Sequence, residues 1–366
     1  MIFGSDFVEE RLFAEGSDTR RDLIGLGALG SGTLLANHLQ RRTGIEHLNQ
    51  SKEVINNPEL NKKVMINLGK KFRKNGGVIL NSNNAADVYI QNLIFKDNIK
   101  ELGSKNGLGF NLDSHAHGTE ITSHKDISNL VGAKSKGDLI NRINSSDFNK
   151  RIFANGNGSL DSKKVDKYYD MLKAVRGNKH VSEKLDRTLK ALDGNSAGVI
   201  NSFIGVDTPG ILAHEMGHSY YKGQGKDTLG GIAHKLYHPG QLSKKLGMVT
   251  SAITGIRSGY KGEDNESNLS KYGGTVFTGL SEAPRLVSEI SANNKGKELL
   301  QEAIKEAGGA AEKSVVKGGF RPFKISNKSY LLGAAGAIAG SQALHYGGRL
   351  AGKAARSLKG EKLEDR

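Results

Sequence analysis

The chain has 366 residues, which is enough for two or three domains and for at least one well-formed core. It contains no cysteine, so disulfides and thiolate metal ligands are excluded, and a metal site in this chain must use nitrogen and oxygen ligands. The net charge of +15 indicates attraction to an anionic partner, either a phospholipid surface or, less strongly, nucleic acid.

Residues 1–50 are predicted to form a glycine-rich, apolar helical segment. Their uncharged stretch, 23–40, has about the length of a membrane-crossing helix, but it contains Asn37 and His38, so close helix packing within the protein or with a second copy suits it better. No basic region followed by an apolar region stands at the start, so no signal peptide is expected. We therefore expect a cytoplasmic or peripherally membrane-associated protein, with packaging in a virion as a further option.

Residues 51–155 are polar and rich in Asn, Lys and Gly, and they are predicted to be a region of strands and loops. Within them, Ala86–Phe95 has the β-branched and aromatic composition of a strand.

Residues 156–310 are predicted to form the domain that carries the chemistry. It begins with an amphipathic helix over 161–176, followed by a short strand over 197–204, which is expected to be an edge on which an extended chain can pair. A further helix is predicted to start at Pro209, with Thr208 as its cap.

The most informative stretch of the chain lies in that helix and reads His214-Glu215-Met216-Gly217-His218. Residues four apart share one face of a helix, so both imidazoles can reach one divalent ion. Glu215 lies beside that face, where it can take a proton from a water molecule that attacks a carbonyl carbon. The motif predicts peptide-bond hydrolysis with one Zn²⁺ per chain.

A catalytic zinc site usually has three protein ligands, so a third one must be found. The metzincin pattern requires a histidine at position 224, which is Gln224. The thermolysin pattern requires a glutamate about twenty residues after the motif, and 219–262 contains no glutamate. Asp227 is the one acid in that stretch and remains a minor candidate.

Residues 281–293 supply two stronger candidates on a predicted helix with Ser281 as cap and Pro284 in its first turn. Glu282 and Glu289 are two turns apart, so both cannot bind one ion without distorting the helix. We choose Glu289, which is in the middle of the helix, and keep Glu282 as the alternative. The preceding residues, 241–275, are predicted to be a long basic connection.

Several side chains are candidates for stabilising the oxyanion that develops on the scissile carbonyl. His234 and His238 repeat the spacing of the motif without its glutamate and stand just before Pro239, so a lid or loop is expected there. The remaining candidates are Tyr220, Tyr221 and Arg285.

The two segments together, His214-Glu-Met-Gly-His218 and Glu289-Ile-Ser-Ala-Asn293, resemble the gluzincin pattern His-Glu-x-x-His … Glu-x-x-Ala-Asp. That pattern belongs to the family of the heat-shock protease HtpX and the CAAX prenyl protease. The resemblance implies that His214, His218 and Glu289 bind zinc, that Glu215 is the general base, and that residue 293 supports a ligand. Asn293 departs from the family's aspartate, since it can accept a hydrogen bond but carries no negative charge.

The sequence thus predicts an α+β, helix-rich fold with a zincin-like metallopeptidase core, in which the motif helix and the third-ligand helix lie beside a small sheet. Residues 311–366 are predicted to form a second Gly/Ala-rich helical segment with a basic tail. The predicted function is that of a zinc-dependent endopeptidase acting on a peptide or protein. The alternative is a virion or mobile-element delivery protein that contacts membrane or DNA and carries a minor or vestigial metallopeptidase site.

Overall fold

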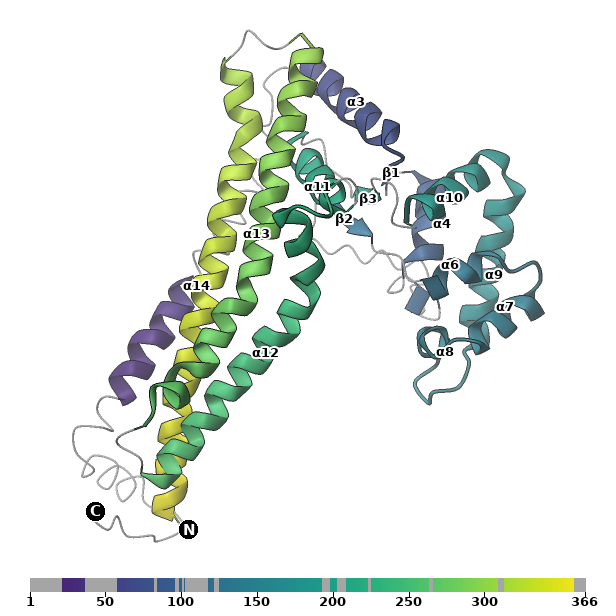
Figure 1. The fold of residues 1–366 in the computed structure, drawn as a ribbon. Coiled ribbons are helices and arrows are strands. Elements are labelled where there is room, and N and C mark those ends of the chain that lie inside the picture. The colour runs from purple at the N-terminus through teal and green to yellow at the C-terminus, as the bar shows by residue number, and fades with distance from the viewer. Residues whose placement is uncertain are drawn as a thin grey trace. The chain divides into compact units, whose positions relative to one another are not determined.

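The computed structural model describes residues 22–36, 58–81, 84–95, 99–100, 102, 118–121, 125–192, 198–202, 209–222, 225–262, 266–308 and 313–358. These residues are mostly helical and include a small sheet, so the predicted α+β, helix-rich class is confirmed (Figure 1). The chain divides into two compact units. The sheet unit comprises 51–228 and 291–323, and the helical unit comprises 1–50, 229–290 and 324–366.

The sheet has three strands in the order β1-β3-β2, namely β1 (Val78–Asn81), β3 (Val199–Ser202) and β2 (Gly118–Ile121). β3 pairs with β1 in parallel and with β2 in antiparallel orientation. The strand predicted over 197–204 is therefore present, but the prediction that it is an edge is wrong, because Ile200 has a partner on each side, Ile79 and Glu120. β2 is an edge of the described sheet.

Within 51–228, the described helices of the sheet unit include α3 (Pro58–Lys74), α4 (Ala85–Ile94), α6 (Lys125–Val131), α7 (Lys136–Asn144), α8 (Asp147–Phe153), α9 (Ser162–Gly177), α10 (Lys179–Leu192) and α11 (Pro209–Lys222). The described part of 51–155 is thus mainly helical, and the prediction of strands and loops there is wrong.

Helix α4 shows the reason for that error. The side chain of Asn84 accepts hydrogen bonds from the backbone nitrogens of Ala86 and Asp87 and so caps the helix. Ile90, Leu93 and Ile94 are buried at helical spacing. Capping and burial outweigh the β preference of this segment, which is weak and depends on context.

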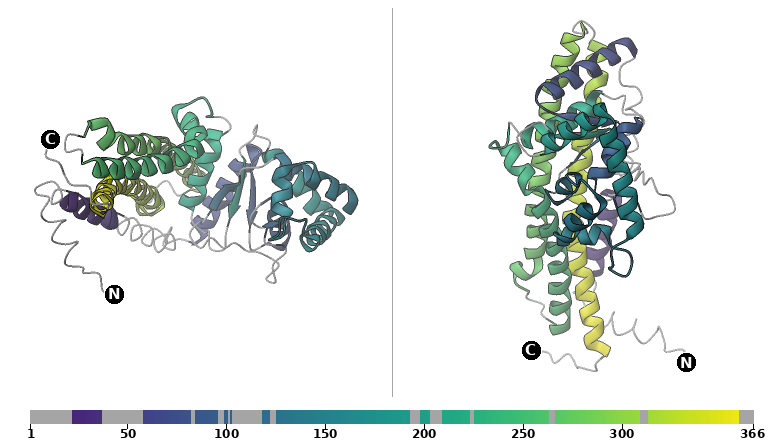
Figure 2. Two further views of the ribbon diagram at one scale, coloured as in Figure 1. Left: turned by 90° about the horizontal axis from the view of Figure 1, so that it is seen from below. Right: turned by 90° about the vertical axis from the view of Figure 1, so that its right-hand side faces the viewer.

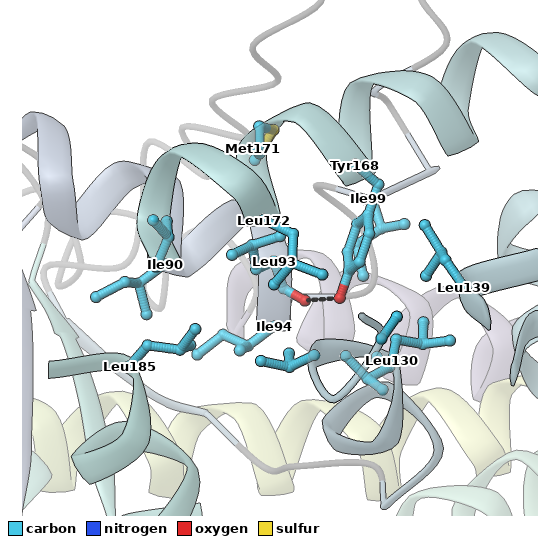
Figure 3. Packing of buried hydrophobic residues seen from close by; sticks show 14 of the residues in the cluster. Ile90, Leu93, Ile94, Ile99, Leu130, Leu139, Tyr168, Met171, Leu172 and Leu185 are labelled. Carbon is cyan, nitrogen blue, oxygen red and sulfur yellow. Dashed lines mark hydrogen bonds between the residues drawn. The ribbon is translucent and has the colours of Figure 1, made fainter. Parts of the chain in front are cut away.

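The larger hydrophobic core of the sheet unit surrounds α9 (Figure 3). Tyr168 is fully buried there, and its hydroxyl donates a hydrogen bond to the carbonyl oxygen of Leu93 at 3.0 Å. Desolvation by burial raises the pKa of this phenol far above its usual value. The amphipathic helix predicted over 161–176 is confirmed by α9, whose N-cap is Asp161.

Helices cover both faces of the sheet (Figure 2). Val199 belongs to the larger core and Ile200 to a second one, because successive side chains of a strand point to opposite faces. The members of this second core come from α3, α11, β3, the later part of α13 (Asn268–Glu306) and, with Phe323, from α14 (Lys313–Leu358). They include Leu68, Leu212, Met216 and Leu300. This core fixes the helix that carries the motif against the later part of α13.

The described helices of the helical unit are residues 22–36, α12 (Leu229–Lys261), α13 up to Ile290 and α14 (Lys313–Leu358) from Lys324 onward. These long helices run side by side (Figure 1). Two expectations are wrong here, because most of 241–275 is helical rather than a connection, and Pro284 lies inside α13 rather than in the first turn of a helix.

Several glycines of 241–275 are sites of close helix contact. A Cβ atom at Gly255 would lie 2.1 Å from the carbonyl oxygen of His345, and one at Gly274 would lie 2.7 Å from the carbonyl oxygen of Gly247. The interior of this unit is polar, with Ser251 and Ser341 joined at 2.8 Å and Lys353 paired with Asp22 at 2.9 Å. None of the described helices combines the length and the apolar character needed to cross a membrane.

Candidate metal centre

The two motif histidines lie on the part of α11 that is outside the second core. Leu212, Ala213 and Met216 are buried in that core, while His214 and His218 are only partly buried. The two imidazole rings are 4.7 Å apart between centroids, with an interplanar angle of 83°. Packing of the apolar side thus orients α11 so that both rings are presented together. The expected cap, Thr208, lies outside the described residues.

Glu289 completes a group of potential metal ligands with His214 and His218, and one ligand atom from each lies within 4.8 Å of the others. Nitrogen and oxygen atoms bound to one zinc ion are at most about 4 Å apart, so a small side-chain rotation closes the difference. Two imidazoles and one carboxylate are a donor set that suits zinc and leaves a fourth position open. The group can hold a metal ion.

The alternative ligand, Glu282, has other partners. Its side chain is 1% exposed and forms ion pairs with Lys244 at 2.6 Å and with Arg285 at 3.4 Å. Arg285 also lies over the ring of Tyr330, with its guanidinium carbon 5.7 Å from the ring centroid. Glu282 and Arg285 therefore neutralise each other's charge inside the helical unit, and Glu282 is outside the His214–His218–Glu289 group.

Asn293 lies one turn after Glu289 and is fully buried. Its Oδ1 atom is 2.8 Å from Nδ1 of His214. Because an amide oxygen only accepts hydrogen bonds, Nδ1 is the protonated nitrogen, and the lone pair of Nε2 is left for a metal. The contact orients the His214 ring as the resemblance implies for position 293.

Removing this contact should weaken the site without abolishing it. We expect Asn293→Ala to lower zinc affinity roughly 10- to 100-fold, because the His214 ring loses its orienting partner. Asn293→Asp should hold zinc at least as tightly as the parent, since a carboxylate accepts the same hydrogen bond and makes the ring more basic. Competition with a chromophoric chelator measures both affinities, and equal affinity of Asn293→Ala and the parent would contradict this role.

The close crossing of α11 and α13 depends on two glycines that the sequence did not single out. A Cβ atom at Gly217 would lie 2.2 Å from the carbonyl oxygen of Ala292, and one at Gly296 would lie 2.8 Å from that of Ala213. Real Cβ atoms do not approach backbone oxygens this closely. Gly217 is a variable position of the His-Glu-x-x-His pattern, so only the packing shows why a glycine is needed.

Tyr220 and Tyr221 follow the motif on α11. The Lys295 ammonium lies 4.6 Å from the centre of the Tyr220 ring, so Tyr220 forms a cation–π contact. Desolvation by burial, with a smaller contribution from the Glu298 carboxylate, raises the pKa of the Tyr221 phenol. The Tyr221 hydroxyl thus stays protonated at neutral pH and can donate a hydrogen bond.

The expected lid or loop at His234 and His238 is not observed, because both residues belong to α12. The Nδ1 atom of His234 is 3.4 Å from the Ser288 hydroxyl, on the residue before Glu289. The side chain of His238 lies outside the described residues, and Asp227 is exposed and outside the metal group.

No family model, curated protein or solved structure matches this chain. What the chain does must therefore be inferred from the arrangement of its own residues.

Proposed function

We propose that the chain is a zinc-dependent endopeptidase. The observation that supports this most directly is the convergence of His214, His218 and Glu289, with Glu215 next in sequence to the first ligand. A donor set of two imidazoles and one carboxylate is that of hydrolytic zinc sites, whereas hard cations such as Mg²⁺ prefer oxygen ligands.

The bound zinc would polarise the scissile carbonyl and lower the pKa of the attacking water. Glu215 accepts the proton of that water and passes it to the leaving amine, which is general acid–base catalysis by one carboxylate. Asn293 keeps the His214 ring in its orientation and tautomer. Tyr221, which follows the motif on the same helix, remains our candidate for a donor to the oxyanion.

The position of β2 suits an extended substrate. It is antiparallel to its neighbour, lies at an edge of the described sheet, and packs beside α11. An extended peptide can add to such an edge through backbone hydrogen bonds alone. This favours a peptide or protein substrate over a small molecule. β2, and not the strand at 197–204, would then be the edge with which an extended substrate pairs.

The metal content of two matched variants tests the proposal. We expect the parent and Glu282→Gln to bind one zinc ion per chain, and Glu289→Gln to bind less than about a tenth as much after gel filtration, because an amide is a poor zinc ligand. Both substitutions remove one negative charge from the same helix, so a general electrostatic effect would appear in both. Zinc in Glu289→Gln at the parent's level would contradict the ligand set.

One observation favours the alternative of an interaction or delivery protein. The helical unit carries apolar side chains on its outer faces, which a protease core does not require. We infer that this unit has a binding role of its own, alongside the proposed metal site.

A further inference from the structure

The helical unit has an inverted distribution of polarity. Among the described residues, every exposed large hydrophobic side chain except Ile66, Tyr89 and Leu160 belongs to this unit. In the described part of the same unit, the buried hydrophobic side chains are alanines only: Ala233, Ala334, Ala337 and Ala343. Helices that fold in water normally bury their large apolar residues and expose polar ones.

The interior is held together by contacts that do not depend on hydrophobic burial. Hydroxyl groups of Thr278, Ser341 and Ser251 form a buried hydrogen-bonded chain. His345, which is fully buried, is bonded to Glu266 at 3.1 Å and to Thr254 at 3.3 Å. Glycine contacts and interhelical hydrogen bonds of this kind stabilise helix bundles in hydrocarbon, where the hydrophobic effect between helices is absent.

The apolar surface surrounds the bundle instead of forming a single patch. On α12, the exposed residues between Lys245 and Arg257 are Leu246, Val249, Thr250, Ile253 and Ile256. On α13, those from 272 to 283 are Tyr272, Val276, Phe277, Leu280 and Ala283.

On α14, none of the exposed residues from 331 to 358 carries a charge. The helices α12, α13 and α14 each contact the other two, so their outer faces point in different directions. A second copy of the chain would cover one such face, whereas lipid would cover all of them.

In the described part of this unit, the exposed charges have one sign. Among its described acids, Asp22, Glu266 and Glu282 have side chains that are at most 2% exposed, and Glu289 belongs to the metal group. The exposed charged residues of its described part are Lys235, Lys245, Arg257, Lys261, Lys324 and Lys328. On α12 the apolar stretch is bounded by Lys245 and Arg257 and rises about 16 Å.

We propose that the outer surface of the helical unit enters the hydrocarbon of an anionic lipid surface, with its basic residues at the headgroups. The apolar faces match acyl chains, and the exposed charges of the described residues, all of them basic, match anionic headgroups, to which each nearby Lys or Arg is attracted. Nucleic acid would match the charges but not the apolar faces. The proposal does not depend on zinc binding or on hydrolysis.

Because the chain contains no tryptophan, single tryptophans can report where each surface lies. In the 366-residue chain, we compare Phe277→Trp on α13 with Leu160→Trp, a similarly exposed position of the sheet unit. Both are mixed with vesicles of phosphatidylglycerol and phosphatidylcholine whose acyl chains are brominated. We expect quenching of the tryptophan at 277 to be severalfold stronger than at 160. Equal or absent quenching at both positions would overturn the proposal.

A second pair of variants tests the hydrocarbon contact by affinity. We expect Ile253→Gln to lower partitioning into phosphatidylglycerol-containing vesicles roughly tenfold, and Ile66→Gln in the sheet unit to leave it unchanged, with helical content and zinc content unaffected in both. Release of the bound parent by high salt alone would overturn the proposal, since it would assign binding to the charges. A dimer that Ile253→Gln dissociates, without vesicle binding by the parent, would also overturn it in favour of a second copy.

Discussion

Replacing Glu215 by glutamine is expected to leave one zinc ion bound and to slow peptide hydrolysis roughly 10²- to 10⁴-fold, the contribution typical of a positioned general base. The reason lies in the arrangement of α11, where His214 and His218 belong to the ligand group and Glu215 does not. Glutamine is similar in size to glutamate but cannot accept the proton of the attacking water. The loss should therefore appear in kcat and not in the metal content.

The measurement is cleavage of a labelled unfolded protein, together with mass spectrometry of the chain itself to detect self-cleavage. Glu183→Gln serves as a control, because Glu183 is an exposed glutamate of α10 in the same unit. It should behave as the parent does. If Glu215→Gln cleaved as fast as the parent, the proposed mechanism would be wrong even if zinc were bound.

Adding a single methyl group at Gly217 is expected to disrupt the metal centre. A Cβ atom there would lie 2.2 Å from the carbonyl oxygen of Ala292, which belongs to backbone and cannot rotate away. The helices α11 and α13 would have to separate, moving the histidines away from Glu289. We expect Gly217→Ala to lose most of its zinc and to lower the free energy of unfolding by about 1–3 kcal/mol, the usual cost of overpacking.

The matched control is Gly177→Ala at the end of α9, where no atom lies within 4 Å of the added Cβ. Alanine is about 1 kcal/mol better than glycine inside a helix, so this control should be neutral or slightly stabilising. The same preference makes a loss at Gly217 diagnostic, because only the helix contact opposes it. Full zinc content and unchanged stability in Gly217→Ala would show that the crossing is looser than described.

The sequence could predict those features of the site that depend on residues close together in the chain. A helix places His214 and His218 on one face whatever it packs against, and the absence of glutamate from 219–262 removes a thermolysin-like ligand by inspection. The choice between Glu282 and Glu289 depends on distant contacts. These contacts support Glu289. Glu282 pairs with Lys244 and Arg285, whereas the helix crossing at Gly217 brings Glu289 to the histidines.

The predictions of a strand at 86–95 and of a connection at 241–275 were wrong for related reasons. The segment 86–95 has the composition of a strand, but the Asn84 cap and burial against α9 stabilise a helix. The glycines of 241–275 indicate turns when taken alone, because their helix propensity is low. In the bundle, the same glycines let backbones approach one another, as Gly255 does at His345, and close packing compensates for the propensity.

The sequence by itself determined the α+β, helix-rich class, the two histidines with their adjacent glutamate, and the basic, cysteine-free character of the chain. These properties follow from composition and from periodicities within a few residues. Only the tertiary structure could test the choice of Glu289 over Glu282, and it alone decided which strand is an edge and which side of each long helix faces outward. Those properties depend on contacts between residues far apart in the chain, and such contacts leave no local pattern.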